Sequence, residues 1–167
     1  MLFETTHKVS DIVWALDHQG FLCFSGIGDK EQILTRIAAF FPSAALSEIQ
    51  KGEAHLYEVA ERFFNEGDLG EGFPKAICYG TAFQQDVWKA LREMPAYERM
   101  SYAELAMKVG RPKAVRAVGS AVGANPISPF IPCHRILPKS GGVGQYGWGS
   151  ALKQSLLESE KTFARNM

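Results

Sequence analysis

Two capping boxes in the second half of the chain fix where two helices must begin. Thr81-Ala-Phe-Gln84 and Ser101-Tyr-Ala-Glu104 each place a hydroxyl before a helix and a Gln or Glu three residues later. In this motif the hydroxyl accepts a hydrogen bond from the backbone three residues on, and the longer side chain accepts one from the capping residue. Apolar residues at helical spacing follow the first box: Phe83, Val87, Leu91 and Met94. The region from residue 81 to 167 is therefore predicted to be mainly helical.

The second box is predicted to open a short helix that runs through Val109 and ends at Gly110. Pro112 suits the first turn of a next helix, expected from Lys113 to about Ala124. Two short helices joined in this way form a candidate helix-turn-helix. Helical spacing divides the second helix into an inward apolar face and an outward cationic face. The inward face holds Ala114, Val115, Val118, Ala121 and Val122, and the outward face holds Lys113, Arg116, Gly119, Ser120 and Gly123.

The glycines on the outward face have two interpretations. Glycine costs a helix about 0.5 to 1 kcal/mol relative to alanine, so Gly119 and Gly123 indicate that another surface approaches the backbone closely. That surface could be a second helix within the protein or a nucleic-acid groove. Residues 81–167 carry 12 Lys and Arg against 6 Asp and Glu, whereas residues 1–80 carry 6 against 12. The positive second half favours the nucleic-acid interpretation.

The first half of the chain predicts an α/β packing domain over residues 1–80. The apolar runs Ile12–Leu16 and Phe21–Phe24 predict a hairpin joined through residues 17–20. Asp29 is expected to cap a helix that Pro42 stops, and a further helix is expected from about Ser47 to Asn65. Residues 67–74, rich in glycine, are interpreted as a linker, and no chemical motif occurs in this half.

Composition excludes several classes of protein. The 167 residues are 46% apolar, which is enough for an ordinary core, but no run approaches the roughly 20 apolar residues of a membrane span. The start of the chain lacks an apolar signal core, so the expected location is the cytoplasm, with the nucleus as an alternative. Scattered cysteines and histidines predict neither disulfides nor a metal site, and no cofactor is expected. These residues are Cys23, Cys78, Cys133, His7, His18 and His55.

Ile131-Pro-Cys-His-Arg135 raises the question of what Cys133 does. A lone cysteine is often a small core residue. Here prolines at 126, 129, 132 and 138 predict a stiff, extended course. A thiol becomes a nucleophile as thiolate, and His134, Arg135 and Lys139 offer a base and positive charge. Neighbouring side chains of an extended segment point to opposite faces, so proton transfer from Cys133 to His134 would need a water.

The terminal helix, expected from Ser150 onward, supplies a third candidate. Leu152, Leu156 and Glu160 are spaced by four residues, so Glu160 continues an apolar face unless it lies on a frayed end in water. A buried carboxylate needs a partner, and a histidine N–H is the natural one. Glu160, His134, a water and Cys133 would then form a relay.

These motifs together resemble the O6-alkylguanine-DNA alkyltransferases, also called methylated-DNA–protein-cysteine methyltransferases. The resemblance lies in Asn125-Pro126, Ile131–Ile136, Gly144–Tyr146 and Leu156–Glu160, within the run from Thr81 to about Glu160. Phe83-Gln-Gln-Asp-Val-Trp88 and Pro112-Lys-Ala-Val-Arg-Ala-Val118 are closest to the bacterial members. The resemblance covers about half the chain, and Pro-Cys-His-Arg in this setting is very specific.

The resemblance implies a ribonuclease-H-like α/β domain over residues 1–80 and a DNA-binding, alkyl-accepting domain over residues 81–167. It implies a monomeric suicide protein that flips an O6-alkylguanine out of double-stranded DNA and accepts the alkyl group irreversibly, without cofactor or metal. O4-alkylthymine is a second candidate substrate. No membrane or obligate protein partner is implied.

The resemblance also implies a role for each site residue. Cys133 is the acceptor, His134 and Glu160 form its activating relay, Asn125 orients the loop and the thiol, and Tyr102 donates toward the base or its phosphate. Arg116 takes the place of the flipped nucleotide. The other DNA-contacting residues would be Lys113, Ala117, Gly119, Ser120, Gly123 and Arg135, and the pocket would be formed by Ser128, Val143, Tyr146, Gly147 and Trp148.

Two alternatives and several departures from the family pattern accompany this interpretation. A cysteine hydrolase with a Cys-His-Glu relay would turn over, and the prolines disfavour the helix start where such a thiol usually lies. A non-catalytic binder of alkylated DNA would lack Cys133. Ser128 stands where mammalian members have proline, Trp148 is placed to narrow the pocket, and residues 1–80 hold no counterpart of the mammalian zinc ligands or of a cysteine-rich regulatory domain.

Overall fold

The computed structural model describes residues 12–16, 21–40, 58, 60–63, 75–76 and 78–166. The chain divides into two compact units. The amino-terminal unit comprises Met1–Tyr79 with Pro126–Phe130, and the carboxy-terminal unit comprises Gly80–Asn125 with Ile131–Met167. The predicted hairpin loop, the stop at Pro42, most of the predicted helix over 47–65 and the predicted linker over 67–74 lie outside the described residues.

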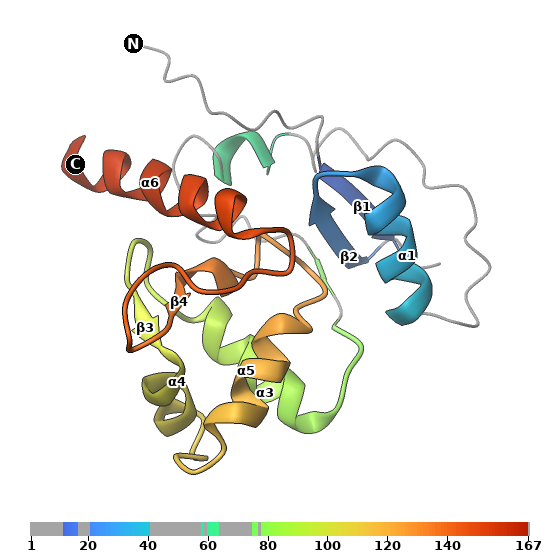
Figure 1. Ribbon diagram of the computed structural model, residues 1–167. Coiled ribbons are helices and arrows are strands. Elements are labelled where there is room, and N and C mark those ends of the chain that lie inside the picture. The colour runs from blue at the N-terminus through green and yellow to red at the C-terminus, as the bar shows by residue number, and fades with distance from the viewer. Residues whose placement is uncertain are drawn as a thin grey trace. The chain divides into compact units, whose positions relative to one another are not determined.

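The amino-terminal unit contains a strand pair and a helix, which Figure 1 shows together. β1 (Ile12–Leu16) pairs antiparallel with β2 (Leu22–Ile27), as the hairpin pattern predicts. β2 begins one residue later and ends three residues later than the predicted apolar run, because Ser25, although polar, is fully buried and belongs to the strand. α1 (Lys30–Phe40) begins after Asp29, whose carboxylate accepts from the Gln32 N–H at 3.0 Å and caps the helix as predicted.

A segment from the second half of the sequence completes this unit. The Ser25 N–H donates to the carbonyl of Pro126 at 2.8 Å, and the Ser128 N–H donates to the carbonyl of Ser25 at 3.2 Å. The Ser25 hydroxyl also donates to the carbonyl of Ser128 at 3.0 Å, and Phe130 packs its ring edge-on against Phe63. Residues 126–130 therefore extend the strand pair along β2, which local sequence patterns do not predict.

The carboxy-terminal unit is mainly helical (Figure 1). Its larger helices are α3 (Ala82–Arg92), α4 (Tyr102–Lys108), α5 (Val115–Gly123) and α6 (Ser150–Asn166). Both predicted capping boxes are present: Thr81 and Gln84 exchange hydrogen bonds of 3.2 and 2.9 Å, and Ser101 and Glu104 exchange bonds of 3.2 and 2.7 Å.

The core of this unit lies among α3, α4 and α5. Trp88 is 1% exposed, and its indole N–H donates to the carbonyl of Ala121 at 2.8 Å, which satisfies the only polar atom of that side chain within the core. Side chains from all three helices surround it: Val87, Leu91, Leu105, Ala106, Val118 and Ala121 are buried. Among the described residues, no helix has the length and apolar character needed to cross a membrane.

The start of α5 differs from the prediction. The helix begins at Val115 rather than at Lys113, because the Ala114 N–H closes a turn on the carbonyl of Arg111 at 2.8 Å before the helix starts. Pro112 lies in that turn, outside the first turn of the helix. Val115, expected to face inward, is 37% exposed because it lies at the helix end, whereas Val118, Ala121 and Val122 are buried as predicted.

The course around Cys133 also differs from the prediction. Cys133–Arg135 forms a single 3-10 turn, closed by the Arg135 N–H on the carbonyl of Pro132 at 3.1 Å, and is not extended. Pro132 restricts itself and Ile131, and Pro138 restricts Leu137, but no proline restricts residues 133–136, so the chain is free to turn there. β4 (Ile136–Leu137) follows at once and pairs in parallel with β3 (Met100–Ser101).

α4 is capped by a glycine in the left-handed conformation, which a substitution can test. Gly110 has a φ of 70°. Its N–H donates to Met107 and the Arg111 N–H donates to Ala106, which together form a Schellman motif. No described atom lies within 4 Å of an added Cβ. Gly110→Ala should therefore lower the free energy of unfolding by about 1 kcal/mol through backbone strain alone, measured by urea denaturation.

Gly123→Ala is the matched control, since this glycine lies within α5 at an ordinary helical φ and also has open space around it. This change should raise the free energy of unfolding by about 0.5 to 1 kcal/mol. Equal effects of the two substitutions would contradict the assignment of Gly110 to a left-handed cap.

Candidate active site

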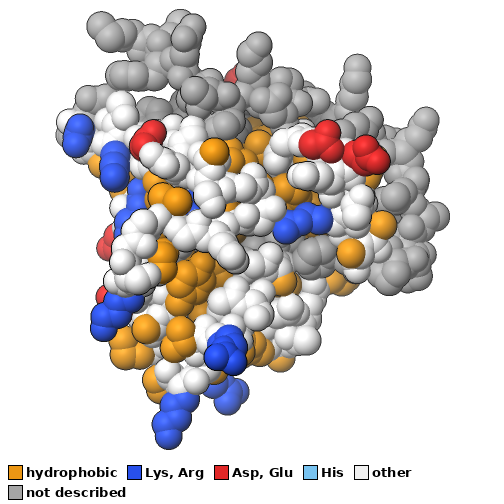
Figure 2. Space-filling model, viewed as in Figure 1, with side chains coloured by type: hydrophobic (Ala, Val, Ile, Leu, Met, Phe, Trp, Pro, Cys, Tyr) orange, Lys and Arg blue, Asp and Glu red, His pale blue; other side chains and the backbone are white. Residues whose placement is uncertain are grey.

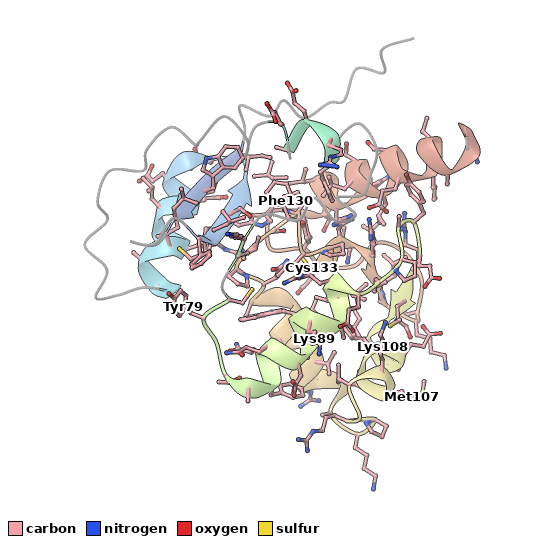
Figure 3. All side chains as sticks on the ribbon, turned by 180° about the vertical axis from the view of Figure 1, so that it is seen from behind. Tyr79, Lys89, Met107, Lys108, Phe130 and Cys133 are labelled. Carbon is pink, nitrogen blue, oxygen red and sulfur yellow. The ribbon has the colours of Figure 1, made fainter. Side chains whose placement is uncertain are left out.

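Cys133 is held by a buried amide. Its side chain is 5% exposed, and its Sγ accepts a hydrogen bond from Nδ2 of Asn125 at 3.0 Å. The same nitrogen donates to the carbonyl of Ile131 at 2.7 Å, so Asn125 ties the sulfur to the loop that carries it. Figure 3 shows Cys133 in the interior, while Lys108 and Met107 lie at the edge of the unit. An N–H aimed at the sulfur stabilises its anionic form, the form that attacks carbon.

His134 and Glu160 are in direct contact. Nε2 of His134 lies 2.7 Å from Oε1 of Glu160, and both side chains are buried, so Glu160 is not on a frayed end. Burial by itself raises the pKa of Glu160, but the hydrogen bond from His134 and the charges of His134, Arg135 and Arg99 lower it to about 2. The ionised carboxylate can only accept, so Nε2 carries the proton and the lone pair of the neutral ring is on Nδ1. Nδ1 is buried too.

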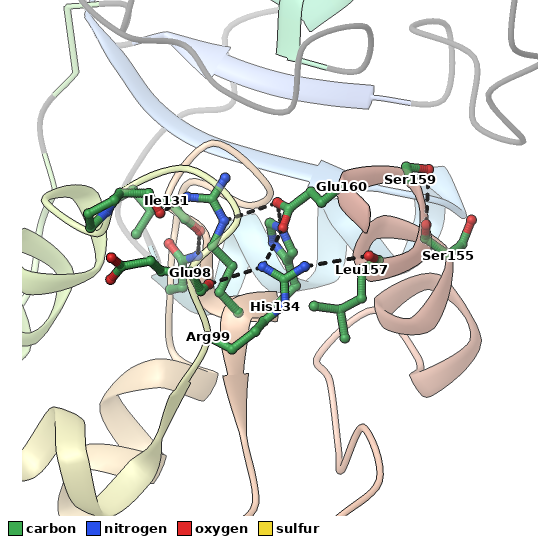
Figure 4. A network of polar contacts seen from close by, with 11 residues as sticks. Glu98, Arg99, Ile131, His134, Ser155, Leu157, Ser159 and Glu160 are labelled. Atoms are coloured by element: carbon green, nitrogen blue, oxygen red, sulfur yellow. Dashed lines mark hydrogen bonds and ion pairs between the residues drawn. The ribbon is translucent and has the colours of Figure 1, made fainter. Parts of the chain in front are cut away.

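Two arginines complete a cluster around Glu160, which Figure 4 shows from close by. Nε of Arg135 donates to Oε1 at 3.0 Å, and Nη1 of Arg99 lies 2.7 Å from Oε2. Arg135 is 3% exposed. The predicted DNA contact of Arg135 is therefore wrong: its side chain is directed into the cluster, because the 3-10 turn places it on the same side as His134.

His134 is kept as a neutral base. Complete burial lowers its pKa, the contact with Glu160 raises it, and the positive charges of Arg135 and Arg99 lower it further; the net direction is downward. A neutral imidazole with a lone pair on Nδ1 can accept a proton, whereas an imidazolium cannot.

Tyr102 and Lys153 lie close enough to Cys133 for their charges to interact. Burial, and then the negative charge of Cys133, raise the pKa of Tyr102, which keeps its phenol protonated as a donor. Nζ of Lys153 donates to the carbonyls of Ile136 at 2.7 Å and Gln145 at 3.4 Å. Burial lowers the pKa of Lys153, although the charge of Cys133 raises it.

Lys153 and Arg99 were not among the site residues predicted from the sequence. Lys153 lies three and seven residues before Leu156 and Glu160, so the same helical spacing that placed Glu160 inward could have placed Lys153 there. Arg99 carries no such signal, because it precedes a strand of only two residues. Within the described ranges, no three His, Cys, Asp or Glu side chains cluster as metal ligands would.

The predicted cationic face of α5 is exposed. Arg116, Ser120 and Gly123 are exposed and Gly119 is partly so. In Figure 2, Lys and Arg side chains gather over the end of the unit that carries α4 and α5. A Cβ at Gly119 would meet only Tyr102, at an ordinary 3.8 Å, and one at Gly123 would meet no described atom within 4 Å. Packing within the described part of the protein therefore requires neither glycine.

The predicted pocket residues fall in different places. Val143, Tyr146 and Trp148 are partly buried and Gly147 is exposed, all on the loop before α6. Ser150 donates to the carbonyl of Gly144 at 3.1 Å, and with Lys153 it ties this loop to α6. Ser128 belongs to the amino-terminal unit, where its backbone N–H and carbonyl are hydrogen-bonded to Ser25. That these residues form a substrate pocket stays a prediction.

Comparison with known proteins adds independent information. The family model described as 6-O-methylguanine DNA methyltransferase, DNA binding domain, matches residues 82–162. The chain is 35% identical to a methylated-DNA–protein-cysteine methyltransferase of Debaryomyces hansenii over 154 residues, 85% of this chain and 81% of the relative. It is 56% identical to a Haemophilus influenzae protein of the same name, over 60% of this chain and just 56% of the relative.

Solved structures agree with the sequence comparison. The crystal structure of Mycobacterium tuberculosis OGT in complex with DNA superposes with a TM-score of 0.67 and 30% identity, over 88% of this chain and 84% of that one. The O6-methylguanine-DNA methyltransferase of Pyrococcus kodakaraensis has a TM-score of 0.69 over 84% and 86% of the chains, at 23% identity. The fold is therefore shared across bacterial and archaeal proteins.

The buried carboxylate predicts a pH-dependent stability. The pKa of Glu160 is depressed from 4.5 to about 2, so its contribution is complete above about pH 4.5 and is lost as pH falls toward 2. Glu160→Gln should lower the free energy of unfolding by about 3 kcal/mol at pH 7, since it leaves Arg135 and Arg99 without their counter-ion. The deficit should shrink below pH 4.5, measured by urea denaturation across pH.

Glu158→Gln on the same helix is the control. Glu158 is exposed and its carboxylate accepts from the side chain of Gln154 at 2.9 Å, so replacing this carboxylate should change stability by less than about 0.5 kcal/mol. A pH-independent deficit for Glu160→Gln, or one no larger than for Glu158→Gln, would contradict the ion-pair cluster.

Proposed function

This chain belongs to the methylated-DNA–protein-cysteine methyltransferase family, and we propose that it repairs DNA by transferring the alkyl group of O6-alkylguanine to its own Cys133. The observation that carries the proposal is the buried array in which Asn125 holds the sulfur of Cys133 while Glu160 holds His134. Binding alone would need neither a tethered thiol nor an oriented imidazole.

The chemistry follows from this array. The thiol proton passes through a water to Nδ1 of His134, and Glu160 stabilises the imidazolium that forms. The thiolate of Cys133 attacks the saturated alkyl carbon, the S–C bond forms as the C–O6 bond breaks, and the electron pair leaves on O6. The departing guanine then needs a hydrogen bond or proton, which the protonated phenol of Tyr102 can offer. Attack at a saturated carbon needs no oxyanion hole.

The α4–α5 pair serves as a helix-turn-helix that presents α5 to DNA. Arg116 projects from the exposed face and fills the space of the flipped nucleotide, which offsets an unstacking cost of a few kcal/mol. Lys113 contacts phosphate. Small side chains on the same face let the DNA approach the backbone of α5 closely: Ala117, Gly119, Ser120 and Gly123. The open space around Gly123 supports this role, because no described neighbour accounts for the glycine.

We further propose that the protein acts as a monomer in the cytoplasm and does not turn over. All three cysteines lie among the described residues and none is in a disulfide, as a reducing compartment requires. A thioether is a poor leaving group from carbon, so the alkylated Cys133 stays alkylated. The carboxy-terminal unit would thus be the alkyl-accepting domain, and the amino-terminal unit would have a ribonuclease-H-like fold. O4-alkylthymine remains a second candidate substrate.

Stoichiometry tests the proposal. Incubation with excess methylated duplex should add a single methyl group per molecule, on Cys133, as measured by intact mass and peptide mapping. Cys133→Ser should abolish transfer but keep DNA binding, which depends mainly on phosphate contacts and weakens steeply with salt. Cys23→Ser is the control and should accept one methyl group. More than one methyl group released per molecule would instead indicate a hydrolase, and binding without any transfer would indicate a lesion binder.

Arg116 separates flipping from chemistry. Arg116→Ala should slow repair of duplex about tenfold or more, but should change the reaction with free O6-benzylguanine by less than about twofold, since a free base needs no flipping. Arg165→Ala on α6 removes an equal charge from an exposed position and should leave both single-turnover rates nearly unchanged. Equal losses on both substrates would show that Arg116 acts in the chemistry or in folding.

A further inference from the structure

Arg99 contacts the site from outside the motif that carries the chemistry. Its Nη1 lies 2.7 Å from Oε2 of Glu160 and donates to the carbonyl of Glu98 at 3.0 Å. Its Nη2 donates to the carbonyl of Leu157 at 3.4 Å, one helical turn before Glu160. Arg99 therefore contacts both the carboxylate of Glu160 and the backbone of α6, as Figure 4 shows. Its side chain is 23% exposed, whereas Glu160 is 4% exposed.

The parallel pair of short strands explains this position. Met100 of β3 pairs with Ile136 of β4, so the residues just before them, Arg99 and Arg135, lie side by side. Two adjacent guanidinium groups in a largely buried place repel each other unless an anion lies between them. Glu160 is that anion, with Oε1 toward Arg135 and Oε2 toward Arg99.

The two carboxylate oxygens of Glu160 have different partners. Oε1 receives both Nε2 of His134 and Nε of Arg135. Oε2 faces Arg99. Without Arg99 the carboxylate could rotate and offer either oxygen to His134 or to Arg135. The contact of Arg99 with Oε2 is an ion pair without hydrogen-bond geometry, and it leaves Oε1 turned toward Nε2 of His134. Nδ1 is then the acceptor of the neutral ring.

The charges around His134 affect its protonation. Glu160 faces it from α6, Arg135 from its own turn and Arg99 from the segment before β3. Lys153 of α6 is turned to the carbonyl of Ile136. One negative and two positive charges leave this cluster at +1 before His134 is protonated, so each arginine opposes formation of an imidazolium. Arg99 is one of the causes that lower the pKa of His134.

We propose that Arg99 is a positioning residue for alkyl transfer, which locks the Glu160 carboxylate toward His134 and keeps that histidine neutral and ready to accept the thiol proton. This inference rests on the proposed alkyl transfer to Cys133. It differs from a stabilising surface ion pair, which would hold α6 in place but would not change the protonation of His134.

The first measurement needs no activity. The imidazole of His134 is titrated by NMR in the folded protein, with His134→Gln used to assign its signals among the four histidines. Arg99→Met and Arg99→Gln should move the midpoint of His134 to higher pH by about one unit. Arg99→Lys, which keeps the charge, and Arg165→Met, which removes an exposed one, should leave it within about 0.3 unit of the wild type. Unchanged midpoints in both neutral variants would overturn the proposal.

The second measurement follows transfer to O6-benzylguanine between pH 5 and 8. Arg99→Gln should lose rate on the acid side, with the acid limb moved upward by the shift that NMR shows, and should keep the rate at pH 8 within about twofold. Arg99→Lys should restore the wild-type profile. The same fold-loss at every pH would show a purely structural role and overturn the proposal. Absence of transfer by the wild type would instead refute the proposed function, while the titration of His134 would still test the coupling to Arg99.

Discussion

The carboxylate of Glu160 is the group on which the site depends. It is buried, ionised and shared among His134, Arg135 and Arg99, which come from the 3-10 turn and the segment before β3. A buried charge is costly unless it is paired, so these elements must meet at α6 for the unit to fold. The interaction that orients His134 thus also joins these elements, and the two effects cannot be separated by removing Glu160 itself.

The 3-10 turn at Cys133–Arg135 is equally important. An extended chain would have sent the side chains of Cys133 and His134 to opposite faces, whereas the turn lets the sulfur meet Asn125 while the imidazole meets Glu160. The same turn carries Arg135 inward. A residue that looks suited to phosphate binding in the sequence is therefore part of the interior.

Family membership supports the fold and the type of activity, whereas the role of Arg99 rests on local geometry. The relatives share the name of the activity, and the fold is common to proteins at 23 to 30% identity. The contacts of Arg99, by contrast, come from this chain's own structure. The control of His134 by Arg99 is therefore a property that has to be measured in this protein.

Local chemistry in the sequence was sufficient to predict much of the site. Thr81, Ser101 and Asp29 start helices through hydrogen bonds to residues three positions away, and the four-residue spacing of Leu156 and Glu160 places the carboxylate inward. The Pro-Cys-His-Arg motif, together with the family resemblance, predicts Cys133 as the nucleophile. Such features depend on neighbours along the chain, so the sequence alone determines them.

Only the tertiary structure decided the rest. Arg99 and Arg135 become neighbours because β3 and β4 pair in parallel, and residues 126–130 join the amino-terminal unit because Ser25 accepts and donates hydrogen bonds there. The inward course of Arg135 and the late start of α5 likewise depend on which carbonyl closes a turn. These features join residues about 35 to 100 positions apart or balance nearly equal local alternatives, and the energy that selects among them arises from burying charges and polar groups with their partners.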